Sequence, residues 1–199
     1  MNSPPLSVRI TGNSFLKVSS PSNLVRSSKT LLTLFLVQSG MMKISAVRVV
    51  DYENSDRFER LIRPEKPLLP EIEKLTGITN DSLTECPSIV TVLEEFLNWH
   101  KHDLLTVYNR EFDIAFLEKA FERLKINFDR PNLDIFFVVN KLYPNIVRRN
   151  SRAAYNALNL SASSEDDVDV IAEIWIACLH GLKELGVRAV WGIDDVDIS

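Results

Sequence analysis

The first fifty residues of this 199-residue chain contain no aspartate or glutamate, and the first acidic residue is Asp51. The same fifty residues hold six Lys and Arg, so the other 149 residues carry a net charge of −10 within a whole-chain charge of −4. The chain is therefore a basic first part joined to an acidic body. Any carboxylate chemistry must be built from residues after position 50.

Cysteine, histidine and long apolar runs are also scarce. The two cysteines, Cys86 and Cys178, lack the spacing of metal ligands and indicate a reducing compartment, so we expect a cytoplasmic protein. The longest apolar run, Leu31 to Val37, is far too short to span a membrane. Two of the three histidines, His100 and His180, are predicted to be surface groups at helix ends rather than ligands.

Residues 1–29 are rich in Ser and contain three prolines without sustained periodicity, which predicts a disordered leader. Arg, Lys and Ser without acids are also typical of an organellar transit peptide, and both interpretations remain open. Residues 30–185 are predicted to form one domain, and residues 186–199 a tail.

The domain begins with three predicted strands, Thr30 to Val37, Ile44 to Asp51 and Arg57 to Arg63, which form an antiparallel meander. A short helix follows at Pro70 to Gly77, with Pro at its start and Gly at its end. Pro87 to His100 has the periodicity of an amphipathic helix.

Asp113 lies where a buried strand, Leu104 to Val107, runs into a helix with apolar residues at three- and four-residue spacing. On that helix it points along the face that packs on the sheet. A carboxylate in this position needs a partner, and a metal ion is one candidate. The alternative is that Asp113 caps the exposed amides of the helix start.

The pattern Asn109-x-x-Phe112-Asp113-x-x-Phe116-Leu117 resembles the second motif of the DEDD, or DnaQ-like, exonucleases. This family includes the proofreading epsilon subunit of bacterial DNA polymerase III and the exonuclease insert of Gram-positive replicative polymerases. The resemblance extends from Phe35 to Leu182. It implies an α/β fold of the ribonuclease H type, in which a mixed sheet of a three-strand meander plus parallel strands is flanked by helices. It also implies that Asp113 is one of four carboxylates that hold two divalent ions.

The segment from Glu165 to Trp175 is similar to the last helix of the family, and this places Asp167 at a metal-binding aspartate. Asp167 shares a helical face with Ile171 and Trp175 and so can turn toward the sheet. A structural interpretation is also open, because Ser163 followed by Asp166 is typical of a capping box.

The first motif of the family, Asp-x-Glu, has no counterpart here. The most similar segment places Leu36 at the Asp and Gln38 at the Glu, and Ala162 stands where the family's general-base His would be. Gln38 offers a carbonyl oxygen to a cation but no charge. Asp113 and Asp167 are then the catalytic carboxylates, and with Gln38 the metal ligands, of a site that holds one weakly bound Mg²⁺ or Mn²⁺ or none. Replacement ligands could come from Glu165, Asp166 or Asp169.

The resemblance implies weak binding of nucleic-acid 3′ ends, with DNA and RNA both open. The candidate contacts lie in the second motif and ahead of the last helix: Asn109, Phe112, Arg148, Arg149 and Arg152. We expect a derived 3′-5′ exonuclease with little or no hydrolysis, unless a gene-model error has removed the true first strand. The alternative is a noncatalytic scaffold that binds a polymerase or another protein.

Overall fold

The computed structural model describes residues 9–10, 29–37, 40–101, 103–128, 130, 132–160, 166–185 and 196–197, with backbone only for 9–10, 29–37, 40 and 196–197. A five-stranded sheet has the order β4-β3-β2-β5-β6. β2, β3 and β4 are antiparallel, whereas β5 runs parallel to both β2 and β6. Its strands are β2 (Lys29–Val37), β3 (Gly40–Val50), β4 (Glu53–Leu61), β5 (Leu104–Val107) and β6 (Asn132–Asp134).

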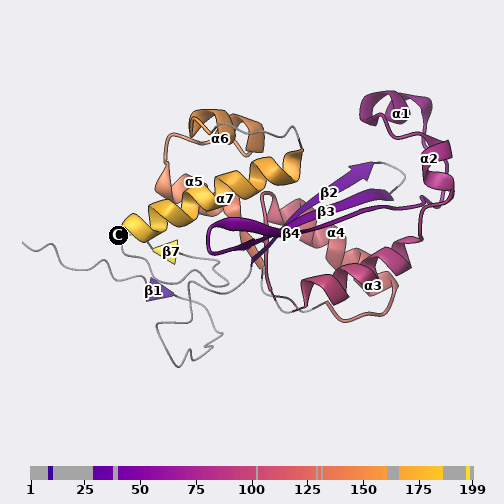
Figure 1. Ribbon diagram of the computed structural model, residues 1–199, viewed down its shortest axis with the longest axis horizontal. Coiled ribbons are helices and arrows are strands. Elements are labelled where there is room, and N and C mark those ends of the chain that lie inside the picture. Colours follow the sequence, from indigo (N-terminus) through magenta and orange to yellow (C-terminus); the bar gives the residue numbers. More distant parts are fainter. Residues whose placement is uncertain are drawn as a thin grey trace, which may run out of the picture.

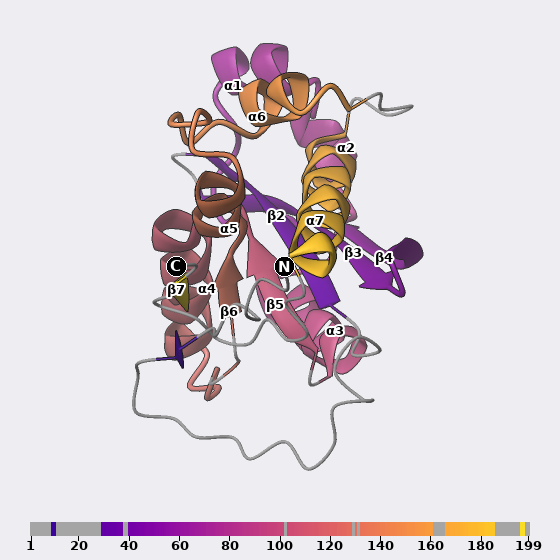
Figure 2. The ribbon, with the colours of Figure 1, turned by 90° about the vertical axis from the view of Figure 1, so that its left-hand side faces the viewer.

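Helices cover both faces of this sheet (Figures 1 and 2). On one face, α3 (Ile89–His100) and α4 (Arg110–Arg123) pack over a core that includes Phe96 and Phe121. On the other face lie α5 (Ile135–Leu142), α6 (Ser151–Ala157) and α7 (Asp167–Glu184). The predicted α/β architecture of the ribonuclease H type is confirmed.

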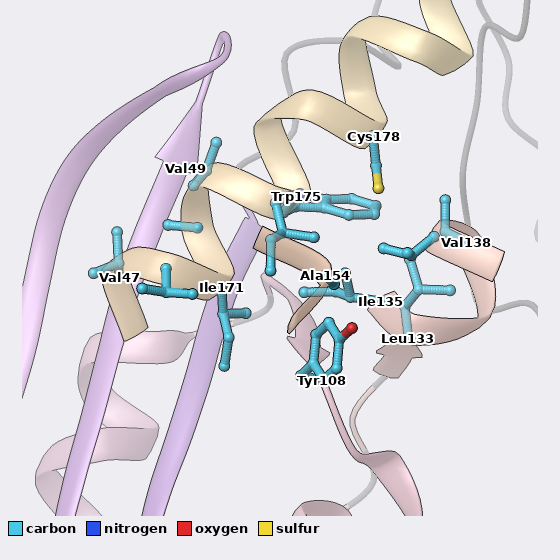
Figure 3. Packing of buried hydrophobic residues seen from close by; sticks show 14 of the residues in the cluster. Val47, Val49, Tyr108, Leu133, Ile135, Val138, Ala154, Ile171, Trp175 and Cys178 are labelled. Carbon is cyan, nitrogen blue, oxygen red and sulfur yellow. The ribbon is translucent and has the colours of Figure 1, made fainter. Parts of the chain in front are cut away.

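The second core forms where α7 crosses the sheet. Trp175 and Ile171 of α7 lie over Val47 and Val49 of β3, and Ile135 and Val138 lie on the opposite side of the cluster (Figure 3). Trp175 is fully buried. Burial of a large aromatic side chain contributes a few kcal/mol, about 3–5 when it is truncated to alanine, so this contact anchors α7 on the sheet.

The predicted strands and long helices are present, with shifts of a few residues at their ends. The short helix α1 (Pro70–Thr76) begins at proline and ends before Gly77, whose φ of 71° is the left-handed cap that glycine favours. Two short helices were not predicted: α2 (Asn80–Thr84) and α6. The N-terminus of α2 is capped by reciprocal hydrogen bonds between Thr79 and Ser82, so a capping signal was present in the sequence.

Outside the main sheet, β1 (Arg9–Ile10) pairs antiparallel with β7 (Val196–Asp197). These two pairs of residues belong to the predicted leader and tail, most of which lie outside the described residues. The division into leader, domain and tail stays a prediction. No helix among the described residues is long and apolar enough to cross a membrane.

One histidine prediction was wrong. His100 is fully buried against Phe96 at the end of α3, and burial lowers its pKa to about 4. His180, by contrast, is exposed, and its ring stacks on Tyr52. Charged groups outside the helix, Asp103, Arg130 and Arg48, act on the His100 ring, and periodicity within the helix could not indicate these neighbours.

Candidate active site

Asp113 lies in the first turn of α4, just past the end of the fully buried strand β5. Asn109 is the N-cap of the helix, and its backbone amide donates a hydrogen bond to the Asp113 carboxylate. Burial raises the pKa of Asp113 to about 6, against the effect of this hydrogen bond, and the negative charge of Asp134 raises it further. The backbone amide of Asn109 stabilises the ionised carboxylate, and a cation would stabilise it further.

Asp134, at the end of β6, is the carboxylate whose charge acts on Asp113. It caps α5 by accepting a hydrogen bond from the Phe137 amide at 3.3 Å. Arg149 approaches its other oxygen to 2.5 Å. The Arg149 guanidinium also lies 4.8 Å from the centre of the Phe136 ring, so both its charge and its flat face are occupied. The predicted nucleic-acid contact Arg149 is thus held by an acid of the site.

Asp167, at the start of α7, is half exposed and pairs with Arg152 at 3.4 Å. Ile171 and Trp175 on the same helical face are buried, but the Asp167 side chain does not follow them toward the sheet. Arg152 lies in α6 rather than in a loop. An exposed ion pair of this kind contributes little to stability, about 0–1 kcal/mol, so it does not prevent Asp167 from exchanging partners.

The acids beside Asp167 are bound to the edge of the sheet. Arg57 of β4 makes ion pairs with both Asp166, at 3.1 Å, and Asp169. Burial opposes ionisation of Arg57, but the charges of Asp169 and Asp166 outweigh it and raise the pKa of the guanidinium. Asp166 is also the N-cap of α7, in place of the Ser163 cap considered from the sequence. Ser163 and Glu165 lie outside the described residues.

The first-motif position is fixed by the register of β2. The parallel pairing of β2 with β5 ends at Leu32 opposite Val107, and Leu36 lies four residues further along, opposite Met41 of β3. Residues level with the carboxyl end of β5 are therefore near Leu32. Gln38 lies outside the described residues. Whether Leu32 or Leu36 stands at the first-motif position, that position is not an acid, because no Asp or Glu precedes Asp51.

The remaining predicted contacts surround Asp113. Phe112 is 55% exposed, and Asn109 is half-buried. Tyr108 is buried, its ring meets Phe136 edge to face, and burial raises its pKa to about 12.

Over the part of the chain that the structure describes, no three Asp, Glu, His or Cys side chains gather as a metal-binding group. Asp134 is the site residue that the sequence analysis left out, although it too is an acid between a strand end and a helix.

The exonuclease family model matches residues 35–174. The chain belongs to the DnaQ-like exonuclease family. Among curated relatives, it is 27% identical over 164 residues to DNA polymerase III PolC-type of Caldanaerobacter subterraneus subsp. tengcongensis, covering 80% of this chain and 12% of that protein. For the PolC-type polymerase of Staphylococcus haemolyticus the identity is 30%, with 74% of this chain and 11% of that protein covered. The chain thus spans about one-eighth of the length of these relatives.

Solved structures show the same fold. One is a 3′-exonuclease in specific recognition of the 3′ end of histone mRNA stem-loop, with a TM-score of 0.67, 16% identity, and coverage of 78% of this chain and 82% of that chain. Another is the nuclease domain of 3′hExo, a DEDDh family member bound to rAMP, with a TM-score of 0.66, 15% identity, and coverage of 83% and 96%. A third is Exonuclease X with 5′ overhanging duplex DNA, with a TM-score of 0.60, 15% identity, and coverage of 76% and 90%.

Proposed function

We propose that this chain is a derived exonuclease domain that contacts nucleic-acid 3′ ends weakly and hydrolyses them slowly or not at all. One observation carries the proposal: arginines of the chain itself neutralise the acids that surround the site. Arg149 pairs with Asp134, and Arg152 pairs with Asp167. Arg149 binds the largely buried carboxylate of Asp134, whereas the exposed pair of Arg152 with Asp167 is weak and can exchange, so the negative charge that could attract a metal is reduced but not removed.

The residues present do not fit a two-ion centre. Such a centre holds its ions about 3.5–4 Å apart, and the hard cations that occupy it prefer several carboxylate oxygens. Here Asp113 receives a hydrogen bond from a backbone amide, and Asp167 faces an arginine. These residues support one weakly bound Mg²⁺ or Mn²⁺ or none. A missing general base alone typically lowers a rate by about 10²–10⁴.

Contact with nucleic acid rests on exposed groups next to the site. Phe112 presents a ring on which a base can stack, a contact worth about 1–3 kcal/mol in single-strand binding proteins. Arg148 is exposed and can approach a phosphate. The solved relatives were captured with either RNA or DNA, and we leave the choice of polymer to experiment.

The test is cleavage and binding of a single strand labelled at its 5′ end. We expect no shortening above background with Mg²⁺ or Mn²⁺, and no difference between wild type and Asp113→Ala. We expect weak binding that is reduced further by the double substitution Phe112→Ala and Arg148→Ala. Shortening from the 3′ end by wild type, with loss in Asp113→Ala, would contradict the proposal. Unchanged binding by the double variant would exclude the assigned contacts.

A second candidate function is a noncatalytic module that binds a polymerase or another protein. The observation in its favour is that the PolC-type relatives are DNA polymerases of which this chain spans only 11–12%. In those proteins the matching segment is part of a much longer polypeptide. Stable capture of a polymerase by this chain without nucleic acid would favour the module over the exonuclease.

A further inference from the structure

A small apolar pocket opens on the face covered by α3 and α4. Its volume is about 170 Å³. Its floor consists of Met41 and Ile62, which are 3% and 1% exposed, together with Ala120 of α4. Half-buried apolar side chains form the walls: Ile89, Phe116 and Leu124.

The size of the pocket restricts what can enter it. Pockets for drug-sized ligands usually measure about 300–1,000 Å³, so this one is too small to enclose such a molecule. It is large enough for a single apolar side chain. Apolar side chains inserted into well-packed pockets are the usual anchors of protein interfaces.

Positive charge surrounds the opening. Arg63, Lys119 and Arg123 line the pocket and are exposed, and the only acid in the lining is Glu65. Among the described residues, no side-chain hydrogen bond or ion pair engages these three cations. This differs from β4, where the exposed Arg57 and Arg60 are both paired with acids. The excess of positive charge is notable because the body of the chain carries −10.

The pocket and Asp113 share α4: Asp113 lies in the first turn of this helix, whereas the pocket is lined by Phe116 and by residues further along the helix. The floor of the pocket belongs to the core between the sheet and α3 and α4, whereas Asp167 and Arg152 lie on α7 and α6 over the opposite face. The backbone of Arg63 is positioned by a hydrogen bond that its amide donates to the Pro87 carbonyl at 2.9 Å. The lining of the pocket does not include Asp113, Asp134 or Asp167.

We propose that this pocket binds an acidic peptide segment of a partner protein, which inserts one apolar side chain between Phe116 and Leu124. The carboxylates of the segment would pair with Arg63, Lys119 and Arg123. Charge complementarity supports an anionic partner, and the narrow apolar floor supports a peptide over a nucleic acid. A nucleobase requires an open aromatic platform, whereas the one aromatic ring in the lining, Phe116, is half-buried.

The test uses the full chain and a fluorescein-labelled peptide, Asp-Asp-Leu-Phe-Asp-Asp. We expect micromolar binding that weakens as salt is raised. Replacing both Lys119 and Arg123 by Glu should weaken binding about tenfold or more, because opposite charges become like charges. The control is Lys74→Glu, a single exposed charge reversal on α1 that does not line the pocket, and it should leave binding unchanged. A peptide with Leu and Phe replaced by Ser should bind about tenfold more weakly.

Lys119 and Arg123 are exposed, so the double variant should fold, and its melting temperature checks this. The single variant Arg63→Ala, outside α4, provides an independent test and should weaken binding several-fold. Absence of binding at millimolar peptide, or equal loss in Lys74→Glu, would overturn the proposal. If a single-stranded oligonucleotide lost more affinity than the peptide in the double variant, the pocket would be a nucleic-acid contact and the proposal would be wrong. These outcomes are independent of the cleavage assay.

Discussion

Asp113 occupies a half-buried position in which folding raises its pKa from 3.8 to about 6. Between these values the folded state binds more protons than the unfolded state, so the contribution of this group to stability falls as pH rises from about 4 to about 6. Replacing the carboxylate by a neutral amide removes the cost, and the amide oxygen can still accept the hydrogen bond from Asn109. We predict that Asp113→Asn is more stable than wild type by about 1–2 kcal/mol at pH 8 and nearly equal to it at pH 3.5.

Urea unfolding at both pH values measures this difference. The matched control is Glu111→Gln, in the same helical turn but exposed, where loss of an acid near the helix N-terminus should be neutral or slightly destabilising. If added Mg²⁺ stabilised wild type but not Asp113→Asn, a cation would be bound at Asp113. If wild type were the more stable protein at pH 8 without metal, the hydrogen bond from Asn109 would outweigh burial and the prediction would fail.

At the scale of elements, the hairpin between β3 and β4 contains an unusual turn. Asp51 and Tyr52 form a two-residue loop in which both have positive φ, 50° and 70°, the geometry that Asn-Gly normally provides. The Tyr52 ring compensates by stacking on His180 of α7, with ring centres 4.7 Å apart. The turn therefore joins the hairpin to the end of α7.

This arrangement predicts different effects for two substitutions at Tyr52. Both Tyr52→Ala and Tyr52→Gly remove the stacking on His180, but only glycine relieves the left-handed backbone. Tyr52→Ala should therefore be less stable than Tyr52→Gly by about 1 kcal/mol, measured by chemical denaturation. A glycine variant that is the less stable of the two would show that the positive φ carries no strain here.

Sequence patterns predicted the helices that bury an apolar stripe and the strands whose side chains alternate between the two faces of the sheet. They missed the short helices that are held by local polar contacts. The meander, α3, α4 and α7 follow periodicity, whereas α2 and α6 are short helices capped by Thr79 and Asn150. The second motif located Asp113 correctly at a strand end. The pairing of arginines with acids could not be predicted, because it depends on which helix faces which strand.

At the scale of the whole molecule, charge is divided between a basic first part and an acidic body. Within the body, Arg149 and Arg152 are paired with acids of the site, Asp134 and Asp167. A body of net −10 repels phosphate, so attraction to nucleic acid must come from local cations such as Arg148 or from the basic first part. The two sources can be separated by truncation.

A chain that starts at Lys29 lacks Arg9, Lys17 and Arg26, and its net charge changes from −4 to −7. We predict that its melting temperature stays within a few degrees of the full chain, because residues 1–28 carry no apolar periodicity and β1 adds only two paired residues. Its affinity for a single strand should fall, and the plot of log K against log salt should become shallower by about 0.7 for each phosphate that the shorter chain no longer neutralises. A melting temperature lowered by ten degrees or more would mean that the first part is docked on the domain. An unchanged salt slope would assign the attraction to Arg148 and its neighbours alone.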